Sequence, residues 1–472
     1  MRSFRRTGMA AALVVMVAPT SQAQPVTAIV GATVIDGGGG PPLERAVILV
    51  RGGRIEAVGR EGDLALPRGA EIRRLAGRFI TPGFIDMHAH VAFGPIVAEP
   101  GKPGAYRMDY DDRASREMAS TLLGFGITTA RNPGAPTREG VGLRDDIRLG
   151  RIPGPRLFTA GEVIDATVWP GLTTAVATEA QVRAEVARQV GLGVDYVKLY
   201  ASLGPKLIAA GVDEAHRQGV PAIAHLFGTT WTEAAQSGID GIVHIVAGSP
   251  KLLPEHRRAE FMKRFRGTQF MLEWFDYVDF ESAEFTEMVA ALVANHVTVD
   301  PTLVVFEAMA RGDDPAVTNH PDLRYAPTSL LENWRTDFTF DRGWKPDDYQ
   351  IARRAWPRVL AMTKRLADAG VLITVGTDVP NPWVPPGASF HRELELFRDA
   401  GFTNAAIIRL ATRDGAQALG VLSDVGTIAS GKRADLVVLS ANPLDDIRNT
   451  RRIEWVVQDG KWYTPKSLLP TR

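Results

Sequence analysis

Short apolar runs typical of strands alternate with stretches of helical periodicity through most of this chain of 472 residues. This alternation is the pattern of repeated strand–helix units with parallel strands. Thr178 and Gln181 predict a capping box at the start of one connecting helix, on which Val182 and Val186 share a face. About eight strand-like runs are present, and they end near His90, Arg131, Gly161, Lys198, His225, His244, Pro301 and Asp378.

Eight such units over roughly 340 residues fit an α/β barrel of eight parallel strands, a (β/α)8 or TIM barrel with insertions. The competing architecture is a doubly wound open sheet. It would not naturally gather residues from the first and last strands at one site. In a barrel, all carboxyl ends of the strands meet at one rim, where functional sites are built.

Residues of metal-ligand type follow these runs. In TPGFIDMHAH, residues 81 to 90, strand alternation points His88 and His90 the same way, so one metal ion could use both. Lys198, His225, His244 and Asp378 repeat the placement after other apolar runs. We therefore predict a metal site at the rim.

Each of these residues alone has a simpler interpretation. A His-x-His pair is more often a surface or hydrogen-bonded core feature. Lys198 could pair with a carboxylate such as Asp195, and Asp378 could be a helix cap. The combination favours a metal site. Four other histidines occupy polar helical or loop contexts and are not predicted to be ligands: His216, His256, His296 and His320.

The residue types also restrict the metal chemistry. The chain has no cysteine, so a metal must take nitrogen and oxygen ligands. Neutral imidazoles suit a borderline divalent ion such as zinc, and four histidines suggest more than one ion. The Lys198 ammonium would repel a metal, and the residue becomes a ligand only if carbon dioxide converts its amine to a carbamate. Burial and a nearby dication lower a lysine pKa and favour that step.

The two ends of the chain have a different pattern. Strand-like runs alternate with glycine turns from about Val26 to Leu75 and again near the C-terminus, so the ends are expected to pair into one small β-sandwich. Two long connections interrupt the central repeats and are rich in aromatic residues. Such connections could form a lid or a pocket wall, and their aromatic residues could instead serve internal packing or a subunit contact. The predicted parts are a signal peptide at 1–23, a β-sandwich domain from 24–78 plus 424–472, and the barrel at 79–423 with insertions at about 250–296 and 307–357.

The N-terminus has the features of a secretory signal peptide. Three arginines precede an apolar run from Met9 to Ala18, and small residues at Ser21 to Ala23 offer a cleavage site before Gln24. We therefore expect a periplasmic or secreted bacterial protein. The alternative interpretation of the N-terminus is a disordered basic tail. The net charge of +0 excludes a strong electrostatic preference for nucleic acid or anionic membranes, and no later stretch is long and apolar enough to span a bilayer. The expected partner is a small-molecule substrate, with a homo-oligomer possible.

The motifs together resemble the amidohydrolase superfamily. TPGFIDMHAH resembles its first metal motif, VDYVKLY its carboxylated-lysine strand, GVLITVGTDVP its eighth-strand aspartate, and GTIASGKRADLVVL its C-terminal stretch. Within it, the chain is similar to the imidazolonepropionase-like group, which includes carboxylated-lysine prolidases and ochratoxin-hydrolysing amidases. The resemblance implies a barrel with a flanking β-sandwich and two divalent ions. It assigns His88, His90 and Asp378 to the deeper ion, His225 and His244 to the outer ion, and a carbamate on Lys198 to both.

The sequence departs from that group at three places. Leu226 and Phe227 follow the fifth-strand ligand, Val243 precedes the sixth-strand ligand, and Asn132 follows Arg131. None of these changes removes a metal ligand, but all of them alter the pocket. These changes affect the prediction of the substrate more than the prediction of the reaction.

The implied reaction is hydrolysis of an amide, either a peptide, an N-acyl amino acid or a cyclic amide. A hydroxide bridging two ions would attack the carbonyl, and Asp378 would pass the proton to the leaving group. The alternative is a lactonase or another carboxylic ester hydrolase, and a non-catalytic secreted binding protein on the same fold is a further one. Candidate substrate-binding residues are Arg131, Trp169, Tyr200 and His391. Arg131 could instead form an ion pair that stabilises the rim, and His391 could instead serve helix packing.

Overall fold

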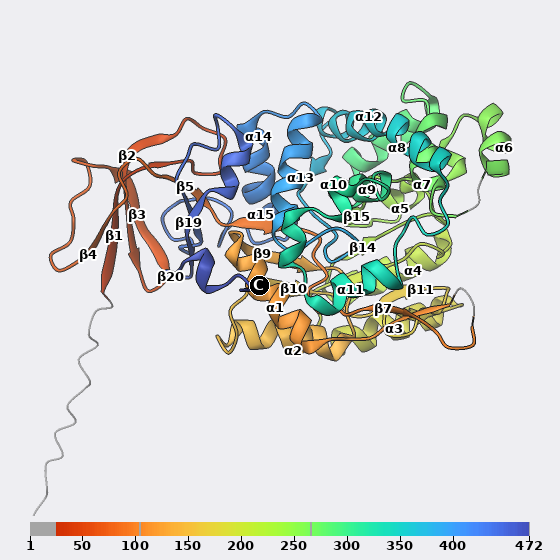
Figure 1. Ribbon diagram of the computed structural model, residues 1–472, viewed down its shortest axis with the longest axis horizontal. Helices are drawn as coiled ribbons and strands as arrows, with labels where there is room; N and C mark the ends of the chain where they lie inside the picture. Colours follow the sequence, from red (N-terminus) through yellow and green to blue (C-terminus); the bar gives the residue numbers. More distant parts are fainter. Residues whose placement is uncertain (1–24, 103–104, 265–266, 472) are drawn as a thin grey trace, which may run out of the picture.

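The structure is a computed structural model that describes residues 25–102, 105–264 and 267–471. The predicted signal peptide at 1–23 lies outside the described residues. Two regions stand out in Figure 1: a sheet built from the two ends of the chain, and a larger body in which helices surround parallel strands. Within the described residues, no helix has both the length and the apolar character needed to cross a bilayer.

The larger body is the predicted barrel of eight parallel strands. Within the described residues, the barrel consists of a sheet of three strands and five consecutive strands of a second sheet. Backbone hydrogen bonds join the two sheets at both ends: Asp195 N donates to Thr159 O over 2.9 Å, and Met87 N donates to Val375 O over 2.8 Å. The strands are β6 (Phe84–Asp86), β9 (Ile127–Asn132), β10 (Arg156–Thr159), β13 (Val197–Leu199), β14 (Ala222–Ala224), β15 (Gly241–Val243), β16 (Thr298–Asp300) and β17 (Leu372–Ile373).

Helices on the outside connect successive barrel strands. The predicted capping box is confirmed in α3, where Thr178 Oγ1 accepts from Gln181 N over 3.3 Å and Val182 and Val186 are fully buried. The next helix ends at Arg217, and Gly219 beyond it has φ +80°, as expected of a helix terminator. The helices are α1 (Asp112–Gly124), α2 (Thr137–Arg148), α3 (Glu179–Gly191), α4 (Pro205–Arg217), α5 (Trp231–Gln236), α8 (Ala283–Ala294), α12 (Pro346–Asp368), α13 (Ala388–Asp399), α14 (Asn404–Arg409) and α15 (Gly415–Ala418).

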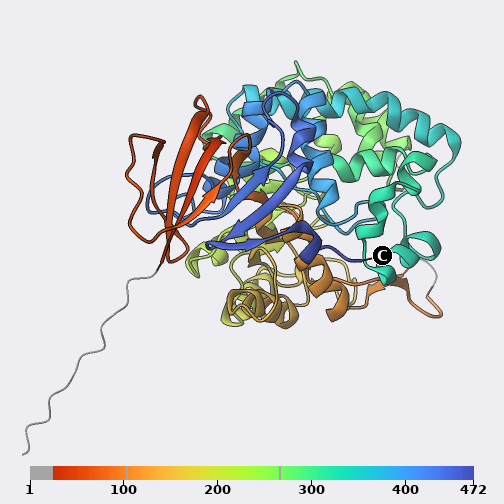
Figure 2. The same cartoon turned by 60° about the vertical axis from the view of Figure 1, so that its left-hand side comes forward.

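The two chain ends share one sheet, as predicted. Its central connection is the antiparallel pair β5 and β18, in which Ile80 lies opposite Val438. One apolar core joins both ends, including Ile29 and Ile48 from the first and Leu436 and Val457 from the second. Figures 1 and 2 show the strands from the two ends of the chain in neighbouring parts of this sheet. The strands are β1 (Val26–Val34), β2 (Leu43–Arg51), β3 (Arg54–Arg60), β4 (Glu71–Arg74), β5 (Phe79–Pro82), β18 (Leu436–Leu439), β19 (Ile453–Gln458) and β20 (Lys461–Tyr463). The exact domain boundaries stay a prediction, and β5 lies in this sheet although the predicted segment ends at residue 78.

The two long connections are largely helical and pack beside the carboxyl rim of the barrel. Trp274 in the first is fully buried, and its Nε1 donates to Ser249 O over 3.0 Å. Phe338 and Phe340 in the second line a cavity. The aromatic residues therefore serve both internal packing and a pocket wall. These connections contain α6 (Glu255–Arg264), α7 (Phe270–Tyr277), α9 (Leu303–Ala310), α10 (Pro315–Thr318) and α11 (Thr328–Thr336).

Shorter strands cover the same rim. The antiparallel pair β7 (Ile96–Ala98) and β8 (Tyr106–Met108) follows β6, and β11 (Val163–Asp165) and β12 (Thr173–Ala175) follow β10. β11 also pairs with β13 next to Leu199. These strands, together with the long connections, form the surroundings of the rim.

Candidate active site

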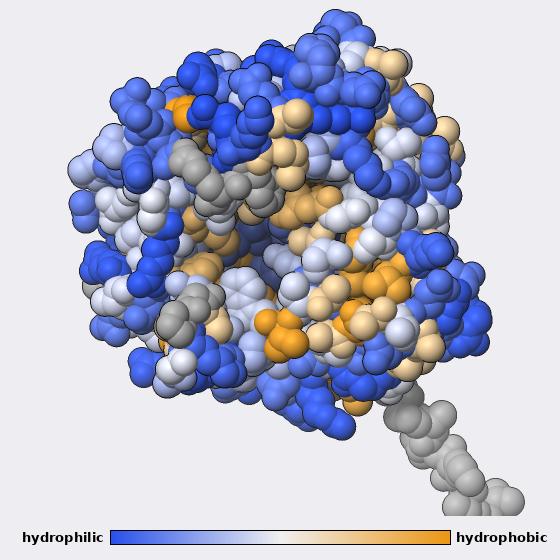
Figure 3. Space-filling view, turned by 90° about the vertical axis from the view of Figure 1, so that its right-hand side faces the viewer, coloured by the Kyte–Doolittle hydropathy of each residue, from blue (hydrophilic) through white to orange (hydrophobic). Residues whose placement is uncertain are grey.

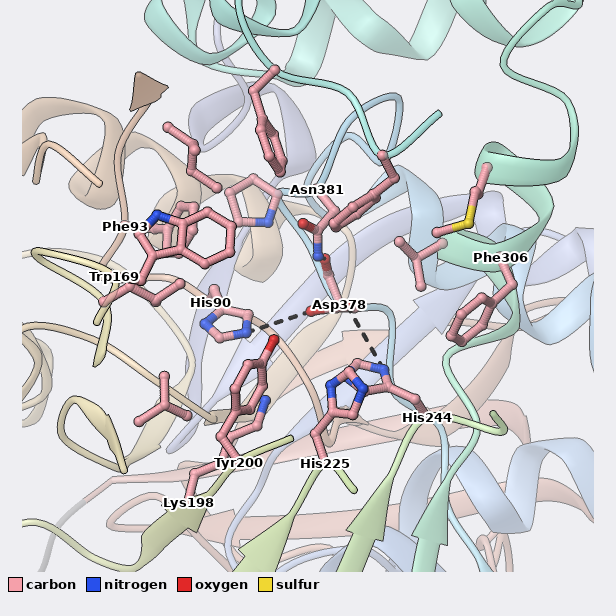
Figure 4. A pocket seen from close by; sticks show the side chains of 18 of the residues that line it. His90, Phe93, Trp169, Lys198, Tyr200, His225, His244, Phe306, Asp378 and Asn381 are labelled. Atoms are coloured by element: carbon pink, nitrogen blue, oxygen red, sulfur yellow. Dashed lines mark hydrogen bonds and ion pairs between the residues drawn. The ribbon is translucent and has the colours of Figure 1, made fainter. Parts of the chain in front are cut away.

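Five of the six predicted ligands line one cavity at the carboxyl rim, and the sixth, His88, lies buried directly behind it. Figure 4 shows Lys198, His225 and His244 on neighbouring strands, with Asp378 and His90 across from them. The face in Figure 3 is hollowed near its centre, and apolar residues surround the opening. The convergence follows from the parallel strands, whose carboxyl ends meet at one rim.

Asp378 contacts both histidines of the first strand. Its Oδ1 lies 3.3 Å from His88 Nε2 and 3.4 Å from His90 Nε2, and its Oδ2 lies 3.8 Å from His244 Nδ1. Asp378 and His244 have φ angles of 60° and 69°, a left-handed conformation that is uncommon outside glycine. Ligand atoms of His88, His244 and Asp378 lie within 4.8 Å of one another, close enough to bind one metal ion.

Hydrogen bonds from one ring nitrogen fix the orientation of three of the histidines. His88 Nδ1 lies 2.8 Å from Asp300 Oδ2, His90 Nδ1 lies 2.9 Å from Gly134 O, and His244 Nδ1 lies 2.8 Å from Thr302 Oγ1. Metal-binding histidines in proteins almost always have such a partner on the second nitrogen, which fixes the tautomer. Burial lowers the pKa of His88 and His244 well below the usual value, so both rings are neutral and can donate a lone pair.

His225 differs from the other three. Both of its ring nitrogens are buried, and neither has a hydrogen-bond partner among the described residues. Burial, together with the charge of Lys198, lowers its pKa to about 3. Its ring packs against Tyr200, Phe227 and His244, with centroid distances of 4.9, 4.7 and 4.6 Å. A buried polar group without a partner is costly, and binding a metal ion would satisfy it.

Lys198 is buried at the base of the cavity without a carboxylate partner in an ion pair among the described residues. Its Nζ lies 3.4 Å from His88 Nε2 and 5.5 Å from the ring centre of Tyr200. Asp195, the partner considered from the sequence, pairs instead with Arg144 at 2.9 Å. Burial lowers the pKa of Lys198 to about 8, which makes the neutral amine accessible near neutral pH.

A further buried carboxylate, Asp86, holds the first and eighth strands together. Asp86 Oδ1 accepts from His88 N over 3.0 Å, and its Oδ2 accepts from Thr377 Oγ1 over 2.7 Å. Burial raises the pKa of Asp86 to about 7. At Gly376 a side chain would collide, because a Cβ there would lie 2.8 Å from His88 Cβ. These contacts fix His88 and Asp378 relative to each other.

Two of the four predicted substrate-binding residues do line the cavity: Trp169 and Tyr200. The other two predictions need correction. Arg131 points behind the site, where its Nε donates to Met87 O over 2.7 Å and its guanidinium lies 3.3 Å from Asp300 Oδ1. His391 is buried in α13, with Nε2 3.1 Å from Phe125 O and Nδ1 2.9 Å from Thr450 Oγ1. Both side chains are occupied by internal partners and lie outside the cavity lining.

The departures noted in the sequence have structural explanations. Phe227 packs its ring on His225 and on Phe270 at 5.0 Å. Asn132 Oδ1 accepts from Val91 N over 3.1 Å and its Nδ2 donates to Thr159 Oγ1 over 2.9 Å, joining the first three strands. Val243 is buried in a small apolar cluster with Tyr196 and Ile223. Only Phe227 is next to a predicted metal ligand's ring.

Sequence reasoning missed Asp300 and Thr302. Asp300 is the last residue of the seventh strand and Thr302 follows it, in TVDPT, and the signal that could have found them is the polar residue at the end of that run. The described residues that could hold a divalent ion are His88, His90, His225, His244 and Asp378, with Lys198 between them. The ring nitrogens of the four histidines and the carboxylate of Asp378 fit nitrogen and oxygen coordination, and three of the histidines have the outer partner expected of a metal ligand.

Comparisons with known proteins show which proteins this chain resembles. The family model described as Amidohydrolase family matches residues 79–463. The chain is 26% identical over 420 residues to an imidazolonepropionase of Agrobacterium fabrum, covering 84% of each chain. It is 27% identical over 428 residues to an imidazolonepropionase of Acidiphilium cryptum, covering 86% of this chain and 89% of that one.

Solved structures share the fold over nearly the whole chain. A prolidase candidate from Bifidobacterium longum is 25% identical with a TM-score of 0.70, covering 96% of this chain and 97% of that one. The ochratoxinase of A. niger is 19% identical with a TM-score of 0.67, covering 94% and 96%. Both alignments span the barrel and the terminal sheet.

Proposed function

Because the chain belongs to the Amidohydrolase family, we propose that it is a metal-dependent hydrolase that cleaves the carbon–nitrogen bond of an amide or cyclic amide. The observation that carries this proposal is the gathering of four buried histidines, a lysine and an aspartate at the buried end of one cavity. Similarity to imidazolonepropionases supports carbon–nitrogen chemistry.

The proposed cofactor is a pair of divalent ions, with zinc the best match to the ligand types. His88, His90 and Asp378 would hold one ion, and His225 and His244 the other. Lys198 would contribute to both as a carbamate, since its amine is accessible in the neutral form. When bound, such ions lower the pKa of water and polarise a carbonyl group.

Asp378 would act as the proton carrier. Its carboxylate faces the cavity beside His90 and His244, at 3.4 and 3.8 Å. It would accept a proton from the attacking water and deliver it to the leaving nitrogen. This delivery matters for an amide because an amine leaves poorly unless it is protonated.

Tyr200 and Trp169 would contact the substrate. Tyr200 packs on His225, and burial raises the pKa of its phenol, so the hydroxyl stays protonated and can donate a hydrogen bond. In Figure 4 this hydroxyl points toward the centre of the site, between His90 and Asp378. Trp169 forms part of the cavity wall farther out.

The test is a hydrolysis screen of protein reconstituted with zinc and bicarbonate against dipeptides, N-acyl amino acids, lactams and lactones. Asp378→Asn should lower amide hydrolysis per bound zinc by about 100-fold or more, with the zinc content of both proteins measured by mass spectrometry. Full amide activity in this variant would contradict the proposed role. Hydrolysis of lactones alone would assign the protein to ester chemistry instead.

A further inference from the structure

We propose that the cavity selects uncharged, apolar substrates: amides whose flanking groups are aromatic or aliphatic and have no free carboxylate beside the scissile bond. This inference rests on the proposed function and narrows its substrate class. It is carried by the composition of the cavity wall and by the positions of the nearby cations.

The wall of the cavity is almost entirely apolar. Above the polar base, the lining comes from β7, the loop around β11, α7, α9 and the segment that follows α11. Figure 4 shows Phe93, Trp169 and Phe306 standing around the site. The apolar lining residues are Phe93, Ile96, Val163, Trp169, Leu172, Met271, Val305, Phe306, Met309, Phe338, Phe340 and Pro380.

Most of the hydrogen-bonding side chains of the cavity lie at its base. Besides the predicted metal ligands, the polar lining residues among the described part of the chain are Tyr200 and Asn381, both neutral. Asn381 Nδ2 donates to Asp378 O over 2.7 Å. These groups lie next to the reacting centre, where they can serve the amide itself. Farther out, the described wall offers the Nε1 of Trp169, which is buried without a hydrogen-bond partner and carries no charge.

Lys198 is the one cation among the described lining residues. It lies at the base beside His88, and the proposed function assigns it to the metal ions. Arg131, which would be the natural partner of a substrate carboxylate, is bound to Asp300 and Met87 behind the site. Apart from Lys198 and the metal ions proposed at the base, no described cation is therefore positioned in the cavity to neutralise a substrate carboxylate.

Two described cations on the connections around the rim, Arg107 and Arg342, are turned away from the cavity or already paired. On β8, Arg107 is opposite Val97, and Ile96, which lines the cavity, points to the other face of the strand pair. The Arg107 guanidinium binds Asp109 at 2.8 Å. Arg342 is exposed and donates to Asp337 O over 2.6 Å and to Tyr106 Oη over 3.2 Å.

An unpaired carboxylate among apolar side chains loses its hydration without compensation, whereas an aromatic group gains from burial there. The wall therefore discriminates by charge as well as by size. A substrate such as a dipeptide or an N-acyl amino acid would place its carboxylate two bonds from the scissile nitrogen, where the described residues supply no free cation.

The experiment compares two amides that differ by one carboxylate: N-benzoylphenethylamine and N-benzoylphenylalanine. With the zinc- and bicarbonate-reconstituted enzyme, kcat/KM for the neutral amide should be at least about tenfold higher. Calorimetry with the Asp378→Asn protein measures binding of the same pair without turnover, and the neutral compound should again bind at least about tenfold tighter.

The two measurements separate the possible failures. Preferred binding of the neutral amide without turnover would support the substrate class and contradict the proposed reaction. Turnover with equal or better use of the carboxylate compound would support the reaction and overturn the substrate class. Absence of both binding and turnover for the neutral amide would also overturn it.

A variant pair tests the wall directly. Met309→Lys places a cation on α9 in the cavity wall and should shift the preference toward the carboxylate compound by about tenfold. Val293→Lys adds the same charge on α8, away from the cavity, and should leave the preference unchanged. Arg342→Ala should also leave it unchanged, and loss of any residual carboxylate binding in that variant would show that the rim holds charged substrates. If Met309→Lys does not fold, the wild-type comparison decides.

Discussion

The Nδ1 atom of His88 lies 2.8 Å from the Oδ2 atom of Asp300, and both side chains are fully buried. The other carboxylate oxygen of Asp300 faces Arg131 at 3.3 Å. The three groups form a chain from the back of the barrel to the cavity. It fixes the His88 ring so that Nε2 points to Asp378.

Asp300→Asn should weaken zinc binding by about 10- to 100-fold, because the His88 ring loses the carboxylate that sets its tautomer and raises its basicity. Competition with a chelator measures this affinity. Asp165→Asn is a suitable control, since Asp165 is also buried but accepts from Ser202 and not from a histidine. Equal zinc affinity in Asp300→Asn and the wild type would refute the role assigned to Asp300.

Reactivation of the metal-free protein should require bicarbonate and become faster as pH rises through about 8. The pKa of Lys198 is lowered to about 8, so half of its amines are neutral there. An ordinary lysine would be neutral in only about one molecule in 300 at that pH. Recovery of activity is followed after adding zinc at several pH values.

Two variants complete this measurement. Lys198→Met keeps an unbranched chain but cannot form a carbamate, so it should bind less zinc and show no bicarbonate effect. Lys206→Met removes an exposed lysine on α4 and should reactivate like the wild type. Bicarbonate-independent recovery of the wild type would argue against a carbamate.

The barrel and its rim could be predicted from the sequence because most of the strand-like runs end near a polar residue and parallel strands converge. His90, Lys198, His225, His244 and Asp378 are separated widely along the chain yet line one cavity. The pairing of the two chain ends was also predictable from their shared strand pattern. The family resemblance is confirmed by the match over residues 79–463.

Contacts that depend on side-chain direction could not be predicted in the same way. Arg131 ends a barrel strand as the metal ligands do, but its side chain turns to Asp300 on a strand 169 residues later, a partner that no local pattern marks. His391 is near Asp378 in sequence, yet α13 buries it against Phe125. The apolar wall is likewise assembled from separate connections, whose approach depends on tertiary packing.

Glu393→Gln should destabilise the protein by about 1–3 kcal/mol and raise KM more than it lowers kcat. The Glu393 carboxylate is fully buried and accepts from Leu303 N over 2.8 Å and from Val304 N over 2.6 Å, in the first turn of α9. Glutamine offers only one acceptor oxygen for these two donors. Because α9 carries Val305, Phe306 and Met309 into the cavity wall, its displacement should affect substrate binding first.

Chemical unfolding and steady-state kinetics measure the two effects of Glu393→Gln. Glu395→Gln is the matched control, because Glu395 lies on the same helix as Glu393, α13, but is only partly buried and pairs with Arg392 at 2.9 Å. A Glu393→Gln protein as stable as the Glu395→Gln protein would show that α9 does not depend on this carboxylate.

His391 should make the protein less stable in mild acid, independently of the metal site. Burial lowers its pKa to about 3 in the folded protein, whereas the unfolded chain binds a proton near pH 6.5. The contribution of His391 is therefore fully present above about pH 6.5 and is lost as pH falls, by about 2 kcal/mol at pH 5. The stability difference between the wild type and His391→Gln, measured by urea unfolding, should shrink by this amount between pH 7 and pH 5. His256→Gln, which removes an exposed histidine, should show no comparable change, and a pH-independent difference for His391→Gln would contradict the prediction.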